Sequence, residues 1–216
     1  MRELILLRHA HAESALPDQP DFDRPLSADG LAEAEAAARW LLEQRLIPDQ
    51  VLCSPARRTR ETLEAALAVL GYVDQRLEPS IYEATPGTLA ALLDRYRDTE
   101  RVLLVGHNPG LERLVALLHS GQSGDYRGMP PAGVAVLEFD EGAAVEPGAA
   151  RLAAFWWPWP AGPRNAGAVP GCCCCWPACH GRRLRSMSPA WMRRTRRSAS
   201  CCAPAGASAW KGASRC

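Results

Sequence analysis

The sequence predicts an α/β fold of three layers, in which helices cover both faces of a mostly parallel central sheet. Two observations support this fold class. Short runs of branched apolar residues bounded by polar residues recur along residues 1–158, as at 4–7 and 102–105. Such runs are typical of buried parallel strands. Segments with apolar residues at helical spacing separate the runs, and alternating strands and helices favour a parallel sheet covered on both faces.

The strands and the first helix can be placed from these patterns. The expected strands cover residues 4–7, 51–53, 102–105, 134–139 and 151–155. Ser27 precedes apolar residues at helical spacing between Leu31 and Leu42, so it is expected to cap the first helix. Pro48 lies beyond the end of this helix because proline cannot continue it.

Three further helices follow. The second is expected to begin with Ser54 as its N-cap and Pro55 at its first helical position, and to end at Gly71. The third covers the apolar positions of residues 89–96. Asn108-Pro109 is expected to open the fourth, with Asn108 as its cap. These boundaries place polar residues between each strand and the helix after it.

Composition divides the chain near residue 158. Residues 1–158 hold all 24 acidic residues, and Cys53 is the only one of the 9 cysteines among them. Residues 159–216 are rich in arginine, cysteine and proline without helical or strand periodicity, so we expect no secondary structure there. The sequence predicts one folded domain at 1–158 and a low-complexity tail at 159–216.

The tail leaves three interpretations open. A reading-frame shift in GC-rich coding DNA would produce its mixture of residues and its loss of acids. A disordered segment could instead bind a partner, including nucleic acid through its arginines. Cys172 to Cys175, with Cys179 and His180, have the spacing of half a zinc site, but a second half at standard spacing is missing.

The remaining composition bears on location and assembly. The N-terminus shows one short apolar run without a cleavage-site pattern, and no stretch approaches the roughly 20 apolar residues that a bilayer requires. We therefore expect a cytoplasmic protein that binds neither membrane nor nucleic acid. The helices leave no extended apolar stripe for a dimer, which favours a monomer.

Chemically active residues follow three of the predicted strands. Arg8 and His9 come after the first strand, Arg58 lies in the helix after the second, and His107 follows the strand at 102–105. The carboxyl ends of parallel strands meet at one edge of the sheet, where such folds bind ligands. Helix N-termini and arginine side chains favour phosphate there, and histidine can act as a nucleophile near neutral pH. The pattern predicts a phosphate pocket that contains a nucleophile.

Four motifs in this order resemble the histidine phosphatase superfamily, which has the phosphoglycerate mutase-like fold. Within it, the chain is most similar to the short bacterial phosphohistidine phosphatases of the SixA type. Ala10 stands where the family most often has glycine. The matching motifs are Leu6-Leu7-Arg8-His9-Ala10, Asp23-Arg24-Pro25-Leu26-Ser27 with Gly30, Ser54-Pro55 with Arg58, Glu61 and Thr62, and Val105-Gly106-His107-Asn108-Pro109.

The resemblance implies a role for each residue at the strand ends. His9 would attack phosphorus and carry the phosphoryl group as a transient phosphohistidine. Arg8, Arg58 and His107 would bind the phosphoryl oxygens and stabilise their charge during transfer. This scheme requires no metal or other cofactor.

Other roles are less directly specified. Glu83 lies where relatives with a general acid place a glutamate, although a phosphohistidine leaving group would depend less on such an acid. Arg24 either reaches the pocket or fixes its own loop. Asn108 could contact substrate in addition to capping its helix.

The short segment between Glu83 and His107 bears on the substrate. It has room for one short helix and one strand, whereas mutases and sugar phosphatases carry a long insertion there. We therefore expect no large lid and an open site, which suits a phosphorylated side chain on a partner protein such as a phosphotransfer domain. A small phosphoester substrate (a sugar phosphate or nucleotide) and a non-catalytic phosphate-binding module are the alternatives.

Overall fold

The computed structural model describes residues 1–125 and 128–158, and this part of the chain forms a six-stranded sheet of order β3-β2-β4-β1-β5-β6. The first four strands in this order pair in parallel. β5 pairs antiparallel with β1, and β6 pairs antiparallel with β5. The strands are β1 (Glu3–Arg8), β2 (Gln50–Cys53), β3 (Asp74–Leu77), β4 (Arg101–Gly106), β5 (Val134–Phe139) and β6 (Ala150–Trp156). The predicted α/β class with a mostly parallel sheet is confirmed.

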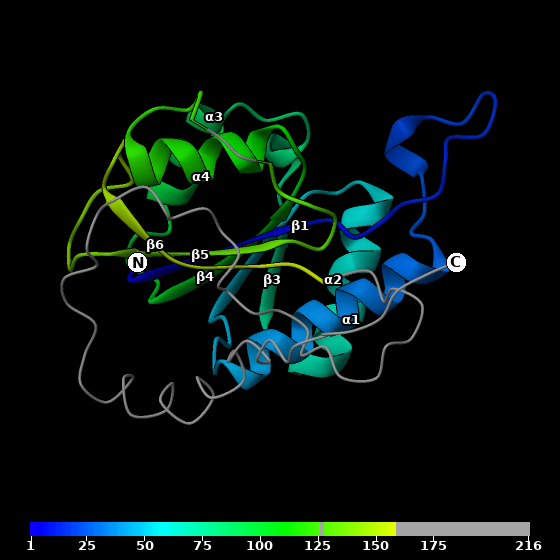
Figure 1. The fold of residues 1–216 in the computed structure, drawn as a ribbon, viewed down its shortest axis with the longest axis horizontal. Helices are drawn as coiled ribbons and strands as arrows, with labels where there is room; N and C mark the ends of the chain where they lie inside the picture. Colours follow the sequence, from blue (N-terminus) through cyan, green and yellow to red (C-terminus); the bar gives the residue numbers. More distant parts are fainter. Residues whose placement is uncertain (126–127, 159–216) are drawn as a thin grey trace, which may run out of the picture. The chain divides into compact units, whose positions relative to one another are not determined.

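Helices cover both faces of the sheet. They are α1 (Ala28–Glu43), α2 (Arg57–Leu70), α3 (Pro86–Asp94) and α4 (Gly110–Ser120), with short 3₁₀ helices η1 (Asp21–Asp23) and η2 (Pro79–Ile81). Figure 1 shows α1 and α2 on one face and α3 and α4 on the other. A hydrophobic core lies on each face of the sheet. β1 contributes alternate residues to each core, because successive strand side chains point to opposite faces. Leu4 and Leu6 pack with the residues of α3 and α4, while Ile5 and Leu7 pack with those of α1.

Two predicted helix boundaries, the start of α1 and the end of α2, are confirmed. The predicted starts of α2 and α4 were wrong. Ser27 accepts a hydrogen bond from the Gly30 amide at the start of α1, and Gly71 ends α2 with a φ of 87°. However, α2 begins at Arg57 after an uncapped turn, and the Ser54 side chain contacts His107 instead. The prediction for Asn108 was also wrong, because α4 begins after Pro109 and has no side-chain cap.

One strand was not predicted. All the residues of β3 are exposed, so this segment lacks the apolar run that marks a buried strand. It forms because it pairs in parallel with β2 at the edge of the sheet. An edge strand needs little apolar surface, which is why its sequence carries no signal.

The segment between Glu83 and His107 contains α3 and β4, so no large lid is present there. Within the described residues, no helix has the length and apolar character needed to cross a bilayer. The expectations for residues 159–216, including the zinc site and nucleic-acid binding, lie outside the residues that the structure describes.

Candidate active site

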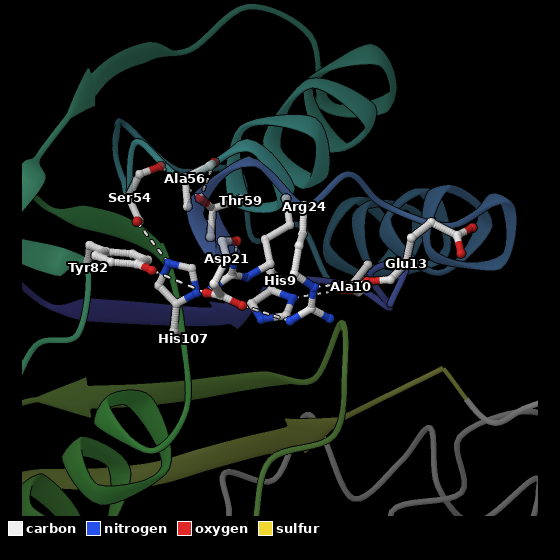
Figure 2. Close-up of polar contacts among 11 residues, drawn as sticks. His9, Ala10, Glu13, Asp21, Arg24, Ser54, Ala56, Thr59, Tyr82 and His107 are labelled. Atoms are coloured by element: carbon white, nitrogen blue, oxygen red, sulfur yellow. Dashed lines mark hydrogen bonds and ion pairs between the residues drawn. The ribbon is translucent and has the colours of Figure 1, made fainter. Parts of the chain in front are cut away.

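The parallel pairing of β1 and β4 brings two histidines together. Arg8 is the register partner of Gly106, so the residues that follow them emerge side by side. The His9 amide donates to the Gly106 carbonyl at 3.0 Å. The centroids of the His9 and His107 rings are 5.2 Å apart, with the planes tilted by 57°. Figure 2 shows both rings at this edge of the sheet.

The contact of His9 determines which of its nitrogens is free. His9 Nδ1 lies 2.8 Å from the carbonyl oxygen of Ala10. A carbonyl oxygen only accepts hydrogen bonds, so Nδ1 carries the proton and Nε2 keeps its lone pair. Burial, together with the positive charges of Arg58 and Arg8, lowers the pKa of His9 to about 4. The ring is therefore neutral near pH 7 and can act as a nucleophile through Nε2.

His107 has a different contact. Its Nε2 lies 2.8 Å from the hydroxyl oxygen of the buried Ser54. Burial, followed by the charge of Arg58 and by His9, lowers the pKa of His107 to about 3. Tyr82 packs edge-on against the ring, with centroids 5.4 Å apart. This ring is thus held in place on the wall opposite His9.

The predicted arginines surround the two rings. Arg8 donates from Nη1 to the Met129 carbonyl at 2.7 Å. Arg58, in the first turn of α2, is buried, whereas Arg57 and Arg60 on either side of it are exposed. A helix start places positive dipole charge beside these groups. Arg8, Arg58 and the start of α2 therefore place positive charge beside the two rings.

Unpaired polar atoms concentrate in the same place. Among the described residues, the buried side-chain nitrogens and oxygens without a hydrogen-bond partner are Arg8 Nε, His107 Nδ1 and Asn108 Oδ1. Buried polar groups are nearly always paired in folded proteins. Arg8 Nε is a donor, and His107 Nδ1 is a donor whenever Nε2 accepts from Ser54. Two atoms suited to an anion therefore lie beside His9.

Two predicted binding residues are tied to their own loops. Arg24 donates to the Glu13 carbonyl at 2.9 Å, and its charge also lowers the pKa of His9. It thus fixes its loop and lies near the pocket. Asn108 donates from Nδ2 to Glu112 and to the Met129 carbonyl, which also binds Arg8.

Glu83 is not part of the group of side chains that surrounds His9. It is exposed, its φ is 54°, and no hydrogen bond described for this part of the chain joins it to His9. Its role as a general acid stays a prediction.

Three site residues were not predicted from the sequence. Asp21 contacts both Arg24 and Arg58, Tyr82 contacts Asp21, and Ser54 contacts His107. Ser54 was assigned to helix capping, so the polar residue was noticed but its partner was not. An aspartate three residues before Arg24 was a weak signal for an ion pair. Nothing in the sequence pattern singled out Tyr82.

Comparison with known proteins agrees with this geometry. Residues 4–95 match the family described as histidine phosphatase superfamily (branch 1). Phosphohistidine phosphatase SixA of Escherichia coli is 31% identical over 131 residues, which cover 56% of this chain and 76% of SixA. The chain belongs to the histidine phosphatase superfamily. The family match and the similarity to SixA together support a phosphatase, and the resemblance to SixA that the motifs predicted is confirmed.

Solved structures and another relative extend the match. The chain has a TM-score of 0.63 and 32% identity to a structure assigned to SixA from Agrobacterium tumefaciens, covering 73% of this chain and 98% of that one. A protein histidine phosphatase SixA complexed with tungstate has the same TM-score at 25% identity, with 71% and 95% covered. An uncharacterized Mycobacterium tuberculosis protein, Rv1276c, is 38% identical over 156 residues, or 67% of this chain and 96% of its own.

Proposed function

We propose that this phosphatase removes the phosphoryl group from phosphohistidine on a partner protein, through an intermediate on His9. The observation that carries the proposal is the state of the His9 ring. Its Nδ1 proton is held by the Ala10 carbonyl, and its pKa of about 4 leaves Nε2 unprotonated near neutral pH. A nucleophile in this state needs no separate base.

In the first step, His9 Nε2 attacks phosphorus and a new P–N bond forms. The P–N bond to the substrate histidine breaks, and the leaving nitrogen keeps the electron pair and takes up a proton from solvent water. Arg8, Arg58 and His107 hold the phosphoryl oxygens, whose charge they stabilise as the group moves. Asn108 and Arg24 support this arrangement from the loops beside it.

In the second step, water attacks the phosphorus of phosphorylated His9. The P–Nε2 bond breaks and its electron pair returns to Nε2, so His9 regains its neutral form. The water's OH stays on phosphorus and its second proton passes to a phosphate oxygen or to solvent as inorganic phosphate leaves. Splitting one displacement into two lets the same preorganised donors act twice. His9 and the donors around it supply both steps without a metal or other cofactor.

The acids near the site favour a phosphohistidine substrate. Hydrogen bonding to Arg24, together with the charge of Arg58, lowers the pKa of Asp21 to about 2, so this carboxylate cannot donate a proton near neutral pH. Glu83 is exposed. The nitrogen of a phosphoramidate is protonated easily, whereas an alkoxide leaving group requires an acid.

Access to His9 supports a protein substrate. His9 is partly exposed, and only α3 and β4 lie between Glu83 and His107. A side chain carried on another protein can reach such a site without the opening of a lid. We propose that the enzyme acts in the cytoplasm as a monomer, on a phosphotransfer domain.

A substrate panel tests this function. The wild-type protein is given a phosphorylated phosphotransfer domain, a sugar phosphate and a nucleotide at equal concentrations, and kcat/KM is measured for each. The phosphorylated domain is expected to give the highest value, and His9→Ala to abolish turnover of all three. His119→Gln is the matched control, because His119 lies at the far end of α4. A preference for a small ester would contradict the substrate class, and unchanged activity of His9→Ala would contradict the mechanism.

A further inference from the structure

Asp21, which none of the motifs identified as a site residue, connects three side chains of the site. Its Oδ1 accepts from Arg24 Nη1 at 2.8 Å, and its Oδ2 accepts from Arg58 Nη2 at 2.9 Å and from the Tyr82 hydroxyl at 3.2 Å. Its main-chain carbonyl also accepts from Arg58 Nη1. Figure 2 shows Asp21 between Tyr82 and Arg24. One residue of η1 thus contacts three side chains of the pocket.

We propose that Asp21 is a positioning residue that fixes the guanidinium groups of Arg58 and Arg24 for a phosphoryl group. The inference rests on the proposed function, which assigns Arg58 to the phosphoryl oxygens and Arg24 to the loop beside them. It adds to that function an anchor on the loop that precedes α1. Asp21 itself does not touch the reacting atoms.

The contacts of Arg58 show how an anchored arginine can still bind substrate. A guanidinium has five N–H donors, and Asp21 takes one from each terminal nitrogen. Three donors remain for phosphoryl oxygens. The Arg58 side chain is 7% exposed and that of Asp21 is 51% exposed, so the carboxylate holds the cation from the solvent side. A guanidinium that is already held along one edge loses little conformational entropy when an anion binds its remaining N–H groups.

Tyr82 extends the anchor to the opposite wall. Its hydroxyl donates to Asp21, while its ring packs edge-on against both His107 and Phe22. The centre of the Arg58 guanidinium lies 6.0 Å from the centroid of the same ring. Asp21, Arg58 and Tyr82 therefore form a connected group that ends at His107.

A competing interpretation makes the opposite prediction. If the Asp21 carboxylate occupied the donors that phosphate needs, substrate would have to displace it, and its removal would tighten anion binding. If Asp21 positions the arginines, its removal weakens anion binding. The affinity for inorganic phosphate therefore separates the two interpretations without any turnover.

The test uses Asp21→Asn in the full chain, with Asp23→Asn as the matched control. Asp23 lies in the same 3₁₀ helix, and its carboxylate makes no hydrogen bond within the described residues. The dissociation constant of inorganic phosphate is measured by calorimetry, and kcat and KM are measured with p-nitrophenyl phosphate. Both are measured well below the melting temperature of each variant.

Asp21→Asn is expected to weaken phosphate binding roughly tenfold, the effect of losing a charge-assisted hydrogen bond. It should also lower kcat by roughly 10-fold to 100-fold, because a misplaced group loses transition-state contacts. Asp23→Asn should match the wild type. If Asp21→Asn does not fold, Asp21→Glu replaces it and should show a smaller loss of both quantities.

Unchanged or tighter phosphate binding in the Asp21 variant would overturn the proposal. A fall in melting temperature with unchanged phosphate binding and kcat would show a purely structural role. Absence of wild-type turnover of a phosphorylated phosphotransfer domain would instead contradict the proposed function, and the phosphate affinities would still decide the role of Asp21.

Discussion

His9 and His107 occupy equivalent places at the ends of neighbouring strands, yet their contacts differ. His9 Nδ1 meets a backbone carbonyl, whereas His107 Nε2 meets the Ser54 hydroxyl, both at 2.8 Å. A carbonyl only accepts, so it fixes one tautomer of His9. A hydroxyl both donates and accepts, so it permits either tautomer of His107. His9 is also partly exposed, while His107 is buried.

Both residues are histidines, so the difference in their chemical roles comes from their hydrogen-bond partners and not from the residue type. His9 has a fixed lone pair on the nitrogen that is free to attack. His107 can donate from Nδ1, and the negative charge of a phosphoryl group would favour its protonated form. We therefore expect a nucleophile on one side of the pocket and a charge stabiliser on the other.

The largest expected effect comes from the nucleophile. His9→Ala should lower kcat by roughly 10³-fold or more, because the covalent step is lost altogether. The measurement is steady-state hydrolysis of a phosphorylated phosphotransfer domain. A loss no greater than that of His107→Ala would remove the distinction between the two rings.

Loss of His107, on the wall opposite His9, should lower kcat less than loss of His9. His107→Ala is expected to lower kcat by roughly 10²-fold to 10³-fold, the effect of removing one preorganised charge stabiliser. Rapid-quench kinetics should still detect phosphorylation of His9, at a reduced rate. His119→Gln is the control, and an absence of any phosphorylated enzyme would assign His107 a direct part in covalent chemistry.

The depressed pKa values predict how stability depends on pH. The unfolded chain protonates histidine near the ordinary pKa of 6.5, whereas the folded chain does so only near 4 for His9 and 3 for His107. The unfolded state therefore binds more protons in this interval, and the free energy of unfolding should fall as pH drops from 6.5 to 4.

Variants sharpen that measurement. His9→Gln should reduce the slope of urea-unfolding free energy between pH 6.5 and 4, and His107→Gln should reduce it down to pH 3. Asp21 acts mainly at lower pH, because its own pKa is lowered from 3.8 to about 2 and its contribution to stability is lost as pH falls through this interval. Slopes identical to the wild type in both histidine variants would contradict the depressed pKa values.

The partner of His107 should have a moderate effect. Ser54→Ala removes the hydroxyl that holds Nε2, so kcat should fall roughly threefold to tenfold. Ser120→Ala, at the exposed end of α4, is the matched control. Ser54→Thr keeps a hydroxyl and should recover part of the loss, whereas equal losses in both Ser54 variants would point to packing alone.

The smallest effect is expected at Glu83. Glu83→Gln should leave hydrolysis of phosphohistidine almost unchanged, because its leaving nitrogen is readily protonated. Any loss should be larger with a sugar phosphate, whose leaving oxygen needs a proton. The ratio of the two kcat values measures this difference, and a larger loss with phosphohistidine would make Glu83 the general acid for that substrate.

The sequence predicted the parts of the site that depend on strand ends. Apolar runs located β1 and β4, and parallel pairing then brought Arg8, His9 and His107 to one edge. Arg58 could be placed because it lies at a helix start directly after β2. The strand and helix positions follow from local periodicity, and the general rule that parallel strands end at one edge of the sheet brings the residues after them together.

The remaining residues depend on contacts across the fold. Asp21 lies on a short 3₁₀ helix without periodicity, and its bond to Arg58 spans 37 positions in the chain. Ser54 had the type and position of a helix cap, and only the placement of β4 turned its hydroxyl toward His107. The exposed strand β3 was missed because its pairing with β2 needs no apolar run. Tertiary placement decided all three.

The most direct test of the central claim is to locate the phosphoryl group on the enzyme during turnover. The wild-type protein and His107→Ala are mixed with a phosphorylated phosphotransfer domain, quenched at alkaline pH, and examined by ³¹P NMR and peptide mapping. We predict a phosphohistidine at His9, with phosphorus on Nε2. Phosphate on His107 or on another residue, or full turnover without a phosphorylated enzyme, would contradict the account.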